Sequence, residues 1–335
     1  MTVALGTALA ALGVSALWSM APESVSRLPI SPILVAILLG IGLSGIAQRR
    51  PGWQPGLALA AGAVLKLAVM LIGLRLSLAQ VGVLGIQALP LVAGALAAGL
   101  GITWWLQRTL GLDRKFAALL AVGSAICGAS AIAATAPALK TRPEQTAYAL
   151  ACVALFGLTA TLLYPWLLEA WLGDSRQIGM VLGAAVHDTA QVTAAAILHE
   201  QTFAATETVA AATVTKLLRN LSMLAVIPAV VWWALKGEAE TRARPAFPLF
   251  VLGFVAFATL RSAGDMLLGE SPAWASFLSL GSWLSGLLFA MAMAAIGMQI
   301  RLAALRALGP KPAVVALLTA VGMGAVALGI VALVG

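Results

Sequence analysis

The sequence predicts an all-helical protein that crosses a membrane many times, and three observations support this fold class. Of its 335 residues, 61% are hydrophobic and only 10% are charged, whereas a soluble domain has roughly 25% charged residues. The mean hydropathy is +1.01. Long apolar segments recur along the whole chain, and turns rich in Gly, Pro or charge separate most of them, such as QRRPGWQPG and KGEAETRARP.

Eleven segments are long enough to span a bilayer, because a helix needs about 20 mostly apolar residues to cross the hydrocarbon core. The first segment lacks the positively charged start of a signal peptide, so we expect it to be retained as a span. The segments cover approximately residues 2–20, 30–47, 60–78, 88–107, 116–139, 146–168, 178–198, 209–235, 246–262, 279–300 and 313–334.

The basic residues predict how these spans are oriented, because cytoplasmic loops of membrane proteins are enriched in Lys and Arg. If the N-terminus is cytoplasmic, most loop cations fall on the cytoplasmic side: Arg49, Arg50, Arg108, Arg114, Lys115, Arg176, Lys236, Arg242, Arg244, Arg301, Arg306 and Lys311. The opposite side has only Arg27, Lys140, Arg142 and Arg261. We therefore expect a cytoplasmic N-terminus and, after eleven spans, a C-terminus on the opposite side of the membrane. The net charge of +8 then reflects loops, and no nucleic-acid partner is expected.

An internal repeat is predicted in the ten spans that follow the first. Residues 1–29 form an N-terminal helix and loop, residues 30–170 a first five-helix repeat, and residues 171–335 a second. Spans five and ten are both rich in small residues, and a basic turn with proline follows each. They run in opposite directions, as in the inverted repeats of transporters. Two other pairs of stretches are also alike: VGSAICGASAIAATA with LGAAVHDTAQVTAAA, and LIGLRLSLAQVGVLG with AIGMQIRLAALRALG.

Span five contains the stretch GSAICGASAIAATAP, which predicts a helix that unwinds in the middle of the membrane. Gly128 tolerates non-helical dihedral angles, and nearby hydroxyls can satisfy freed backbone groups. The N-terminus of the second half-helix would offer unpaired N–H groups to an anion. Cys127, Gly128, Ala129 and Ser130 are therefore candidate substrate-binding residues. A packing surface of small residues is the alternative.

Span ten, LLFAMAMAAIGMQIRL, is the matching candidate for a broken helix. Only Gly297 favours a break there, so its support is weaker than that of span five. Its polar residue Gln299 is included among the candidate substrate-binding residues.

Span seven carries the polar stretch VHDTAQ, in which Asp188 is the only carboxylate deep in a span. On a continuous helix, His187, Asp188 and Gln191 share one broad face. A buried charge costs several kcal/mol unless it faces a cavity or a partner. We expect a coupling-ion site here, since Asp188 can carry charge and histidine titrates near neutral pH. The alternative is a buried network that locks helices together, with an intramembrane arginine as partner.

Span eight carries the stretch TVTKLLRNLSML, in which Lys216, Arg219 and Asn220 lie on one helical face. Arg75 in LIGLRLS is a further cation with no acidic neighbour in sequence. Asp188 can neutralise one of these charges, which leaves others without an anionic partner. This excess of buried cations over carboxylates predicts an anionic substrate. The further candidate substrate-binding residues are Lys216, Arg219, Asn220 and Arg75.

Motifs of other function classes are absent from the sequence. It has no GxxxxGKS phosphate loop, no HExxH and no GxSxG, so an ATP-driven pump and an intramembrane hydrolase have no support. We therefore expect no enzymatic activity, no cofactor and no metal site. Cys127 and Cys152 both lie in apolar segments, which argues against a disulfide framework.

Four stretches resemble a known family: AICGASAIAATAPALK, AVHDTAQVTAAA, TKLLRNLSMLAVIP and LFAMAMAAIGMQIRLAALRALGPKP. They are similar to the YeiH-type family of bacterial inner-membrane proteins, which is named for sulfate export, from about residue 30 to the C-terminus. Many members have Glu-Val where this chain has Asp188-Thr189, so the carboxylate is kept. The resemblance implies a plan like that of cation/proton antiporters and bile-acid symporters, with two crossing broken helices.

The leading hypothesis is a secondary active transporter that exports a small anion, of the sulfate, sulfite or organosulfonate class, coupled to H⁺ or Na⁺. A cation/proton antiporter that uses Asp188 is the second hypothesis. A gated channel or sensor module is the third, although the polar residues gather on a few helices and form no repeated ring. The expected partners are the anion, the coupling ion and the lipid bilayer, with a homodimer left open.

Overall fold

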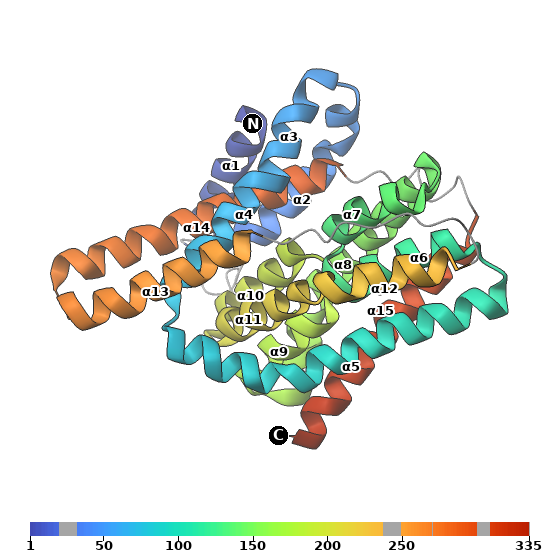
Figure 1. Ribbon diagram of the computed structural model, residues 1–335. Coiled ribbons are helices and arrows are strands. Elements are labelled where there is room, and N and C mark those ends of the chain that lie inside the picture. The colour runs from blue at the N-terminus through green and yellow to red at the C-terminus, as the bar shows by residue number, and fades with distance from the viewer. Residues whose placement is uncertain (20–31, 237–248, 270, 300–308, 335) are drawn as a thin grey trace. The chain divides into compact units, whose positions relative to one another are not determined.

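The computed structural model describes residues 1–19, 32–236, 249–269, 271–299 and 309–334, and within these ranges it contains helices and no strand (Figure 1). The predicted loop at 20–29 and the residues that follow span ten lie outside the described part. So do several cations used for the topology prediction: Arg27, Arg242, Arg244, Arg301 and Arg306.

Six described helical stretches are long and apolar enough to cross a membrane: Pro51–Arg75, Leu78–Leu110, Pro143–Leu172, Phe250–Leu268, Pro272–Gln299 and Lys311–Leu333. Helices α11 (Thr208–Leu221) and α12 (Met223–Ala234) make a seventh if they are counted as one span bent by 45°. The protein is therefore all-helical and multi-pass. Its predicted eleven spans and inverted repeat stay predictions.

The chain forms two compact units, each built from segments that are distant in sequence. Unit 1 consists of Met1–Leu84, Thr193–Ala210 and Leu249–Ile300, and unit 2 of Gly85–Val192, Ala211–Pro248 and Arg301–Gly335. This grouping does not test the predicted repeat boundary near residue 170. Each unit is described by itself below.

Unit 1 contains α1 (Thr2–Ser19), α2 (Pro32–Gln48), a continuous helical stretch over 51–75, α13 (Phe250–Leu268) and α14 (Pro272–Gln299). The stretch 51–75 is made of η1 (Pro51–Trp53), α3 (Gln54–Leu59), the π-helical η2 (Ala60–Val64), α4 (Leu65–Ile72) and η3 (Gly73–Arg75). Ser285 of α14 donates a hydrogen bond of 3.0 Å to the Ala68 carbonyl of α4.

Helices α2 and α14 cross at two glycines. A methyl group built on Gly297 would lie 2.7 Å from the Ile37 oxygen and 2.9 Å from the Ile41 nitrogen. One built on Gly40 would collide with the Ala294 carbonyl. Small residues let membrane helices approach this closely. Helix α14 continues through Gly297 to Gln299, so the break predicted there is wrong, because Gly297 serves a helix crossing.

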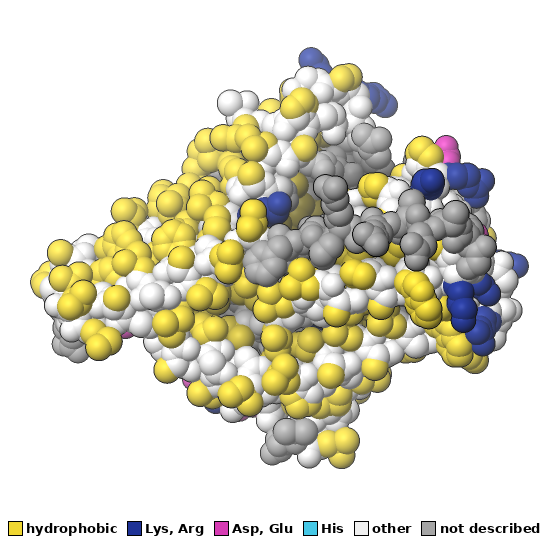
Figure 2. Space-filling model, viewed as in Figure 1, with side chains coloured by type: hydrophobic (Ala, Val, Ile, Leu, Met, Phe, Trp, Pro, Cys, Tyr) yellow, Lys and Arg dark blue, Asp and Glu magenta, His cyan; other side chains and the backbone are white. Residues whose placement is uncertain are grey.

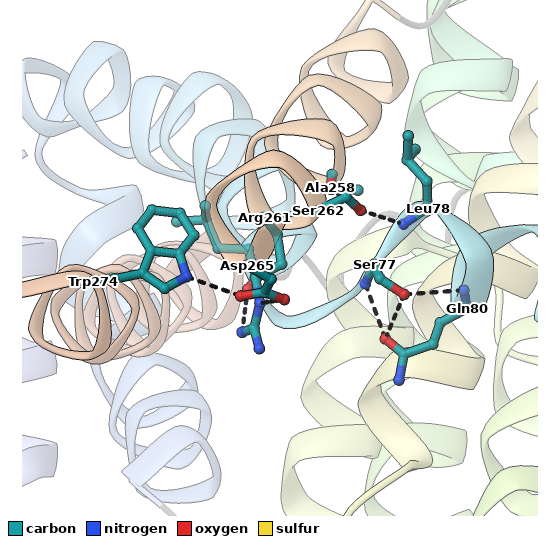
Figure 3. Close-up of polar contacts among 9 residues, drawn as sticks. Ser77, Leu78, Gln80, Ala258, Arg261, Ser262, Asp265 and Trp274 are labelled. Carbon is teal, nitrogen blue, oxygen red and sulfur yellow. Dashed lines mark hydrogen bonds and ion pairs between the residues drawn. The ribbon is translucent and has the colours of Figure 1, made fainter. Parts of the chain in front are cut away.

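Polar contacts fix the ends of α13 and the start of α5 (Leu78–Leu110). Asp265 pairs with Arg261 one turn away at 2.7 Å and accepts a 2.9 Å hydrogen bond from the Trp274 indole (Figure 3). Ser77 and Gln80 form a reciprocal cap: the Ser77 N–H donates to Oε1 of Gln80, and the Gln80 N–H donates to Oγ of Ser77. The backbone N–H of Leu78 at the start of α5 also donates a 2.9 Å hydrogen bond to Oγ of Ser262 in α13 (Figure 3).

Unit 2 holds most of α5 and three helices that follow it closely in sequence: α6 (Arg114–Val122), α7 (Ala129–Leu139) and α8 (Pro143–Leu172). The π-helical turn η4 (Gly123–Cys127) continues α6. Unit 2 also contains α9 (Ser175–Ala185), most of α11, α12 and α15 (Lys311–Val334), while α10 (Thr189–Phe203) starts in unit 2. Its apolar core includes Phe116, Ile126, Tyr148 and Ile227.

The glycine crossing of unit 1 gives the first prediction. Replacing Gly297 with Ala should lower the free energy of unfolding by about 1–3 kcal/mol, because the added methyl group overpacks a backbone contact. Gly42→Ala, on the same helix α2 as Gly40 but with open space around the new methyl group, is the matched control. Thermal melts of the two purified variants test this, and equal melting temperatures would contradict the crossing.

Candidate functional site

Two helices of unit 2 are interrupted, and their interruptions lie against each other. The first helix ends with η4 at Cys127 and resumes as α7 at Ala129. Gly128 between them has φ 63° and ψ −120°, a conformation that L-residues with a side chain rarely adopt. The second helix ends with α9 at Ala185 and resumes as α10 at Thr189. The Gly128 break of span five was predicted and is confirmed.

The break in span seven was not predicted. His187 and Asp188 lie in the non-helical link between α9 and α10, so their predicted place on one continuous helical face is wrong. The physical reason is local: Asp188 precedes α10, and its Oδ1 accepts a 3.0 Å hydrogen bond from the Ala190 N–H. Gln191 reaches back to the Asp188 N–H at 3.1 Å. This reciprocal pair is a capping box, which begins a new helix.

Gln191 also fixes the break to α8. Its Nε2 donates to the carbonyl oxygens of Val153 and Ala154, at 3.3 and 3.2 Å. Gly157 leaves the space, since a methyl group there would collide with the Gln191 amide. Gln191, predicted as a coupling-ion residue, therefore uses its hydrogen bonds within the protein.

Asp188 connects the two breaks. A methyl group built on Gly128, the residue before α7, would lie 3.0 Å from Oδ2 of Asp188, so the carboxylate lies against the start of α7. The side chain of Asp188 is partly exposed. One carboxylate thus contacts the N-termini of α7 and α10, where helix dipoles favour negative charge.

The cations of α11 contact the opposite ends of the broken helices. Arg219 is fully buried, and its guanidinium donates to five carbonyl oxygens, two in η4 and three around the end of α9. These are Ser124 at 2.6 Å, Ala125 at 2.8 Å, Gly183 at 3.3 Å, Ala184 at 2.5 Å and Val186 at 3.0 Å. Such carbonyls are left without a partner at a helix C-terminus, so Arg219 joins both ends.

Lys216 acts in the same way. It is fully buried, and its ammonium donates to Ile126 at 2.8 Å, Val186 at 3.0 Å and the carbonyl oxygen of His187. All three of its protons are therefore used. In the described part of the chain, no Lys or Arg nitrogen lies within 4.0 Å of the Asp188 carboxylate. The expected neutralisation of one cation by direct pairing with Asp188 is wrong, because helix carbonyls bind both cations.

The remaining candidate residues lie partly in unit 2 and partly in unit 1. In unit 2, Asn220 donates from Nδ2 to Oγ1 of Thr189 at 3.2 Å, and its buried Oδ1 has no partner. The Cys127 thiol lies 3.4 Å from the Met223 sulfur, and Nδ1 of the buried His187 has no partner. Ala129 and Ser130 are exposed at the start of α7.

Two candidates belong to unit 1. Arg75 forms a 3.0 Å ion pair with Glu200, which also accepts a hydrogen bond from the Val209 N–H at 2.9 Å. Arg75 has no acidic residue near it in the sequence because its partner lies 125 residues away. Gln299 ends α14, and its Nε2 is buried without a partner.

Comparisons with known proteins agree with the stretches that resembled a family. The family described as "Conserved hypothetical protein 698" matches residues 5–316. A UPF0324 membrane protein of Pseudomonas putida is 34% identical over 317 residues, which cover 91% of this chain and 85% of the relative. Another, from Bordetella bronchiseptica, is 33% identical over 297 residues, 86% of this chain and 88% of the relative.

This chain belongs to the UPF0324 family of membrane proteins. A relative from Streptococcus pneumoniae is also 34% identical, over 281 residues that cover 83% of this chain and 81% of the relative. The resemblance to the YeiH-type family is confirmed. No solved structure matches the chain.

Gly128 gives the second prediction. Gly128→Ala should lower the free energy of unfolding by about 2–6 kcal/mol, because strain at a glycine-only conformation and overpacking each cost about 1–3 kcal/mol. The added methyl group would lie 2.8 Å from Val153 and 3.0 Å from Asp188. Gly173→Ala, also at positive φ but with open space, is the control and should cost only about 1–2 kcal/mol. Denaturant titrations compare them.

Arg219 gives the third prediction. Arg219→Met should lower the free energy of unfolding by about 3–5 kcal/mol, as for a broken buried charged contact, since it strands carbonyls at two helix ends. Arg261→Met, which breaks the partly exposed pair with Asp265, should cost at most about 1 kcal/mol. Thermal melts of the purified variants provide the comparison.

A double variant distinguishes these contacts from a locked Asp188–Arg219 pair. If the two residues were partners, Asp188→Asn would recover stability in the Arg219→Met background. We expect no recovery, because Arg219 donates to carbonyls. Recovery of the melting temperature would show that the two side chains form one pair.

Proposed function

We propose that this UPF0324 protein is a secondary active transporter of a small anion and that the substrate binds at the two helix breaks of unit 2. One observation carries the proposal: two broken helices meet at the half-buried residue Asp188, beside two buried cations. Helices that break in mid-membrane are typical of substrate and ion sites in secondary transporters.

The balance of charge at the breaks supports an anion. Lys216 and Arg219 contribute two positive charges, and ionised Asp188 contributes one negative charge. Each helix terminus contributes about half a charge, positive at an N-terminus and negative at a C-terminus. The breaks contain two N-termini and two C-termini, so the charges of the helix ends cancel. The sum is about +1 with Asp188 ionised and about +2 with it protonated. A small anion of one or two charges balances the site.

The same balance gives a role to the coupling ion. A proton on Asp188 removes the carboxylate charge from the start of α7 and increases the positive charge that attracts the anion. Proton and anion then strengthen each other's binding, and this reciprocity is what coupled transport requires. The buried Oδ1 of Asn220, which has no donor, favours Na⁺ as the second candidate, because sodium binds oxygen ligands.

The substrate class is proposed as sulfate, sulfite or a small organosulfonate, and the direction as export, on the resemblance to the YeiH-type family. The proposed location is the bacterial inner membrane, with the N-terminus in the cytoplasm and the C-terminus in the periplasm. No cofactor or enzymatic step is part of this proposed function.

The fourth prediction tests transport and coupling together. Proteoliposomes containing the full chain should take up labelled sulfate, sulfite or a small sulfonate when a pH or Na⁺ gradient is imposed. Asp188→Asn should lower gradient-driven uptake at least about tenfold, equivalent to about 1.4 kcal/mol of lost coupling, while anion exchange without a gradient persists. Asp265→Asn, a carboxylate of unit 1, is the control and should transport normally.

Three outcomes separate the hypotheses. Unchanged gradient-driven uptake by Asp188→Asn would contradict the coupling role. Asn220→Leu should reduce Na⁺-driven uptake and leave proton-driven uptake intact if sodium binds Oδ1. Exchange of Na⁺ for H⁺ with no movement of any of these anions would identify the cation/proton antiporter instead.

A further inference from the structure

Unit 2 contains a cavity that the proposed transport site does not use. It has a volume of about 320 Å³ and lies between α5, α6 and α12, with Trp104, Ala117 and Trp233 among its lining residues. This volume falls within the range of about 300–1,000 Å³ typical of ligand pockets. The apolar side chains that surround it make it suited to an apolar occupant.

The one hydroxyl in the lining is already satisfied. Thr103 donates a 2.8 Å hydrogen bond to the Gly99 carbonyl, and its oxygen lies 3.0 Å from the hydroxyl of Thr319. No carboxylate, amide or cation lines the cavity. Apart from the indole N–H groups of Trp104 and Trp233, the interior therefore offers a ligand hydrophobic contact, as an alkyl chain requires.

Each of the three helices that line the cavity carries a basic residue close to it. Arg108 comes four residues after Trp104 on α5, Arg114 three residues before Ala117 on α6, and Lys236 three residues after Trp233 at the end of α12. Three to four residues of helix correspond to about 5–6 Å along the axis. All three side chains are exposed, and Figure 2 shows Lys and Arg atoms at the right-hand end, where α5 and α6 meet.

Two of these cations lie over tryptophan rings next to the cavity. The Arg108 guanidinium is 4.0 Å from the centre of the Trp104 ring, and the Lys236 ammonium is 5.8 Å from that of Trp232. Cation–π contact positions the charge without neutralising it. Asp113, at the start of α6, accepts hydrogen bonds from Phe116 and Gln145, and no ion pair to Asp113 is present among the described residues.

We propose that this cavity binds one acyl chain of an anionic phospholipid whose phosphate group is bound by Arg108, Arg114 and Lys236. The three basic side chains favour an anionic headgroup over a zwitterionic one. A zwitterionic headgroup carries a cation that they repel, whereas the phosphatidylglycerol headgroup carries only a negative charge. Basic clusters at the ends of membrane helices bind anionic headgroups in this way. The site is distinct from the helix breaks and does not depend on the proposed transport function.

Native mass spectrometry of the full chain in detergent tests the site, with phosphatidylglycerol and phosphatidylcholine of identical acyl chains as probes. The wild type should retain phosphatidylglycerol in preference to phosphatidylcholine. Arg108→Gln with Lys236→Gln should weaken phosphatidylglycerol binding roughly 30-fold, since each basic residue near an anionic headgroup contributes about fivefold. Arg49→Gln with Arg50→Gln, a basic pair of unit 1, should leave binding unchanged.

A second pair of variants tests the cavity itself. Gly101 lines the cavity, and a methyl group built there meets no atom within 4 Å, so a leucine side chain at this position has open space to enter. It should lower retention of both lipids at least about tenfold, for a loss of roughly 1.4 kcal/mol. Gly82→Leu, on the same helix and equally open but outside the cavity, is the matched control.

Three other outcomes of these experiments would overturn the proposal. Equal retention of the two lipids by the wild type would remove the role of the cations. Unchanged lipid retention by Gly101→Leu would show that the cavity does not bind the acyl chain. A dimer that forms without lipid and is lost in Gly101→Leu would show that a second copy of the chain occupies the cavity.

Discussion

Four helix ends inside unit 2 impose the constraint on which its architecture depends. A helix end in hydrocarbon leaves backbone groups without partners, and each such group costs several kcal/mol. The two C-terminal ends receive hydrogen bonds from Lys216 and Arg219, and the two N-terminal ends contact Asp188. The three charged side chains are thus required by the interrupted backbone, whatever ligand binds beside them.

This constraint changes the argument for an anionic substrate. Counting cations against carboxylates predicted an anion because two cations seemed to lack partners. Their hydrogen-bond donors are in fact used by carbonyl groups, yet a carbonyl dipole carries only a fraction of a charge. The two helix N-termini at the breaks also offset the two C-termini, so the balance stays at about +1 with Asp188 ionised.

Much of this site could be predicted from local sequence. The contacts between residues distant in sequence could not. Gly128 identified one break because only glycine suits that backbone, and the spacing of Lys216 and Arg219 placed both on one face of α11. The second break also had a local signal, because Asp188 followed three residues later by Gln191 is the pattern of a helix start. Because apolar residues flank this pattern on both sides, the segment resembled one continuous transmembrane helix. The carbonyl partners of Arg219 had no signal, since those of Ser124 and Ala125 lie 95 and 94 residues away.

The hydrogen bonds of α11 also have a mechanical consequence. Arg219 and Lys216 bind carbonyls of η4 and of the end of α9 simultaneously, so three elements share contacts that are costly to break. Packed elements joined in this way move as one rigid body, and conformational change occurs at their flexible connections. The part of unit 2 nearest the proposed ligand is then a stiff block. Motions that expose a ligand to either side of a membrane have their hinges elsewhere in the chain.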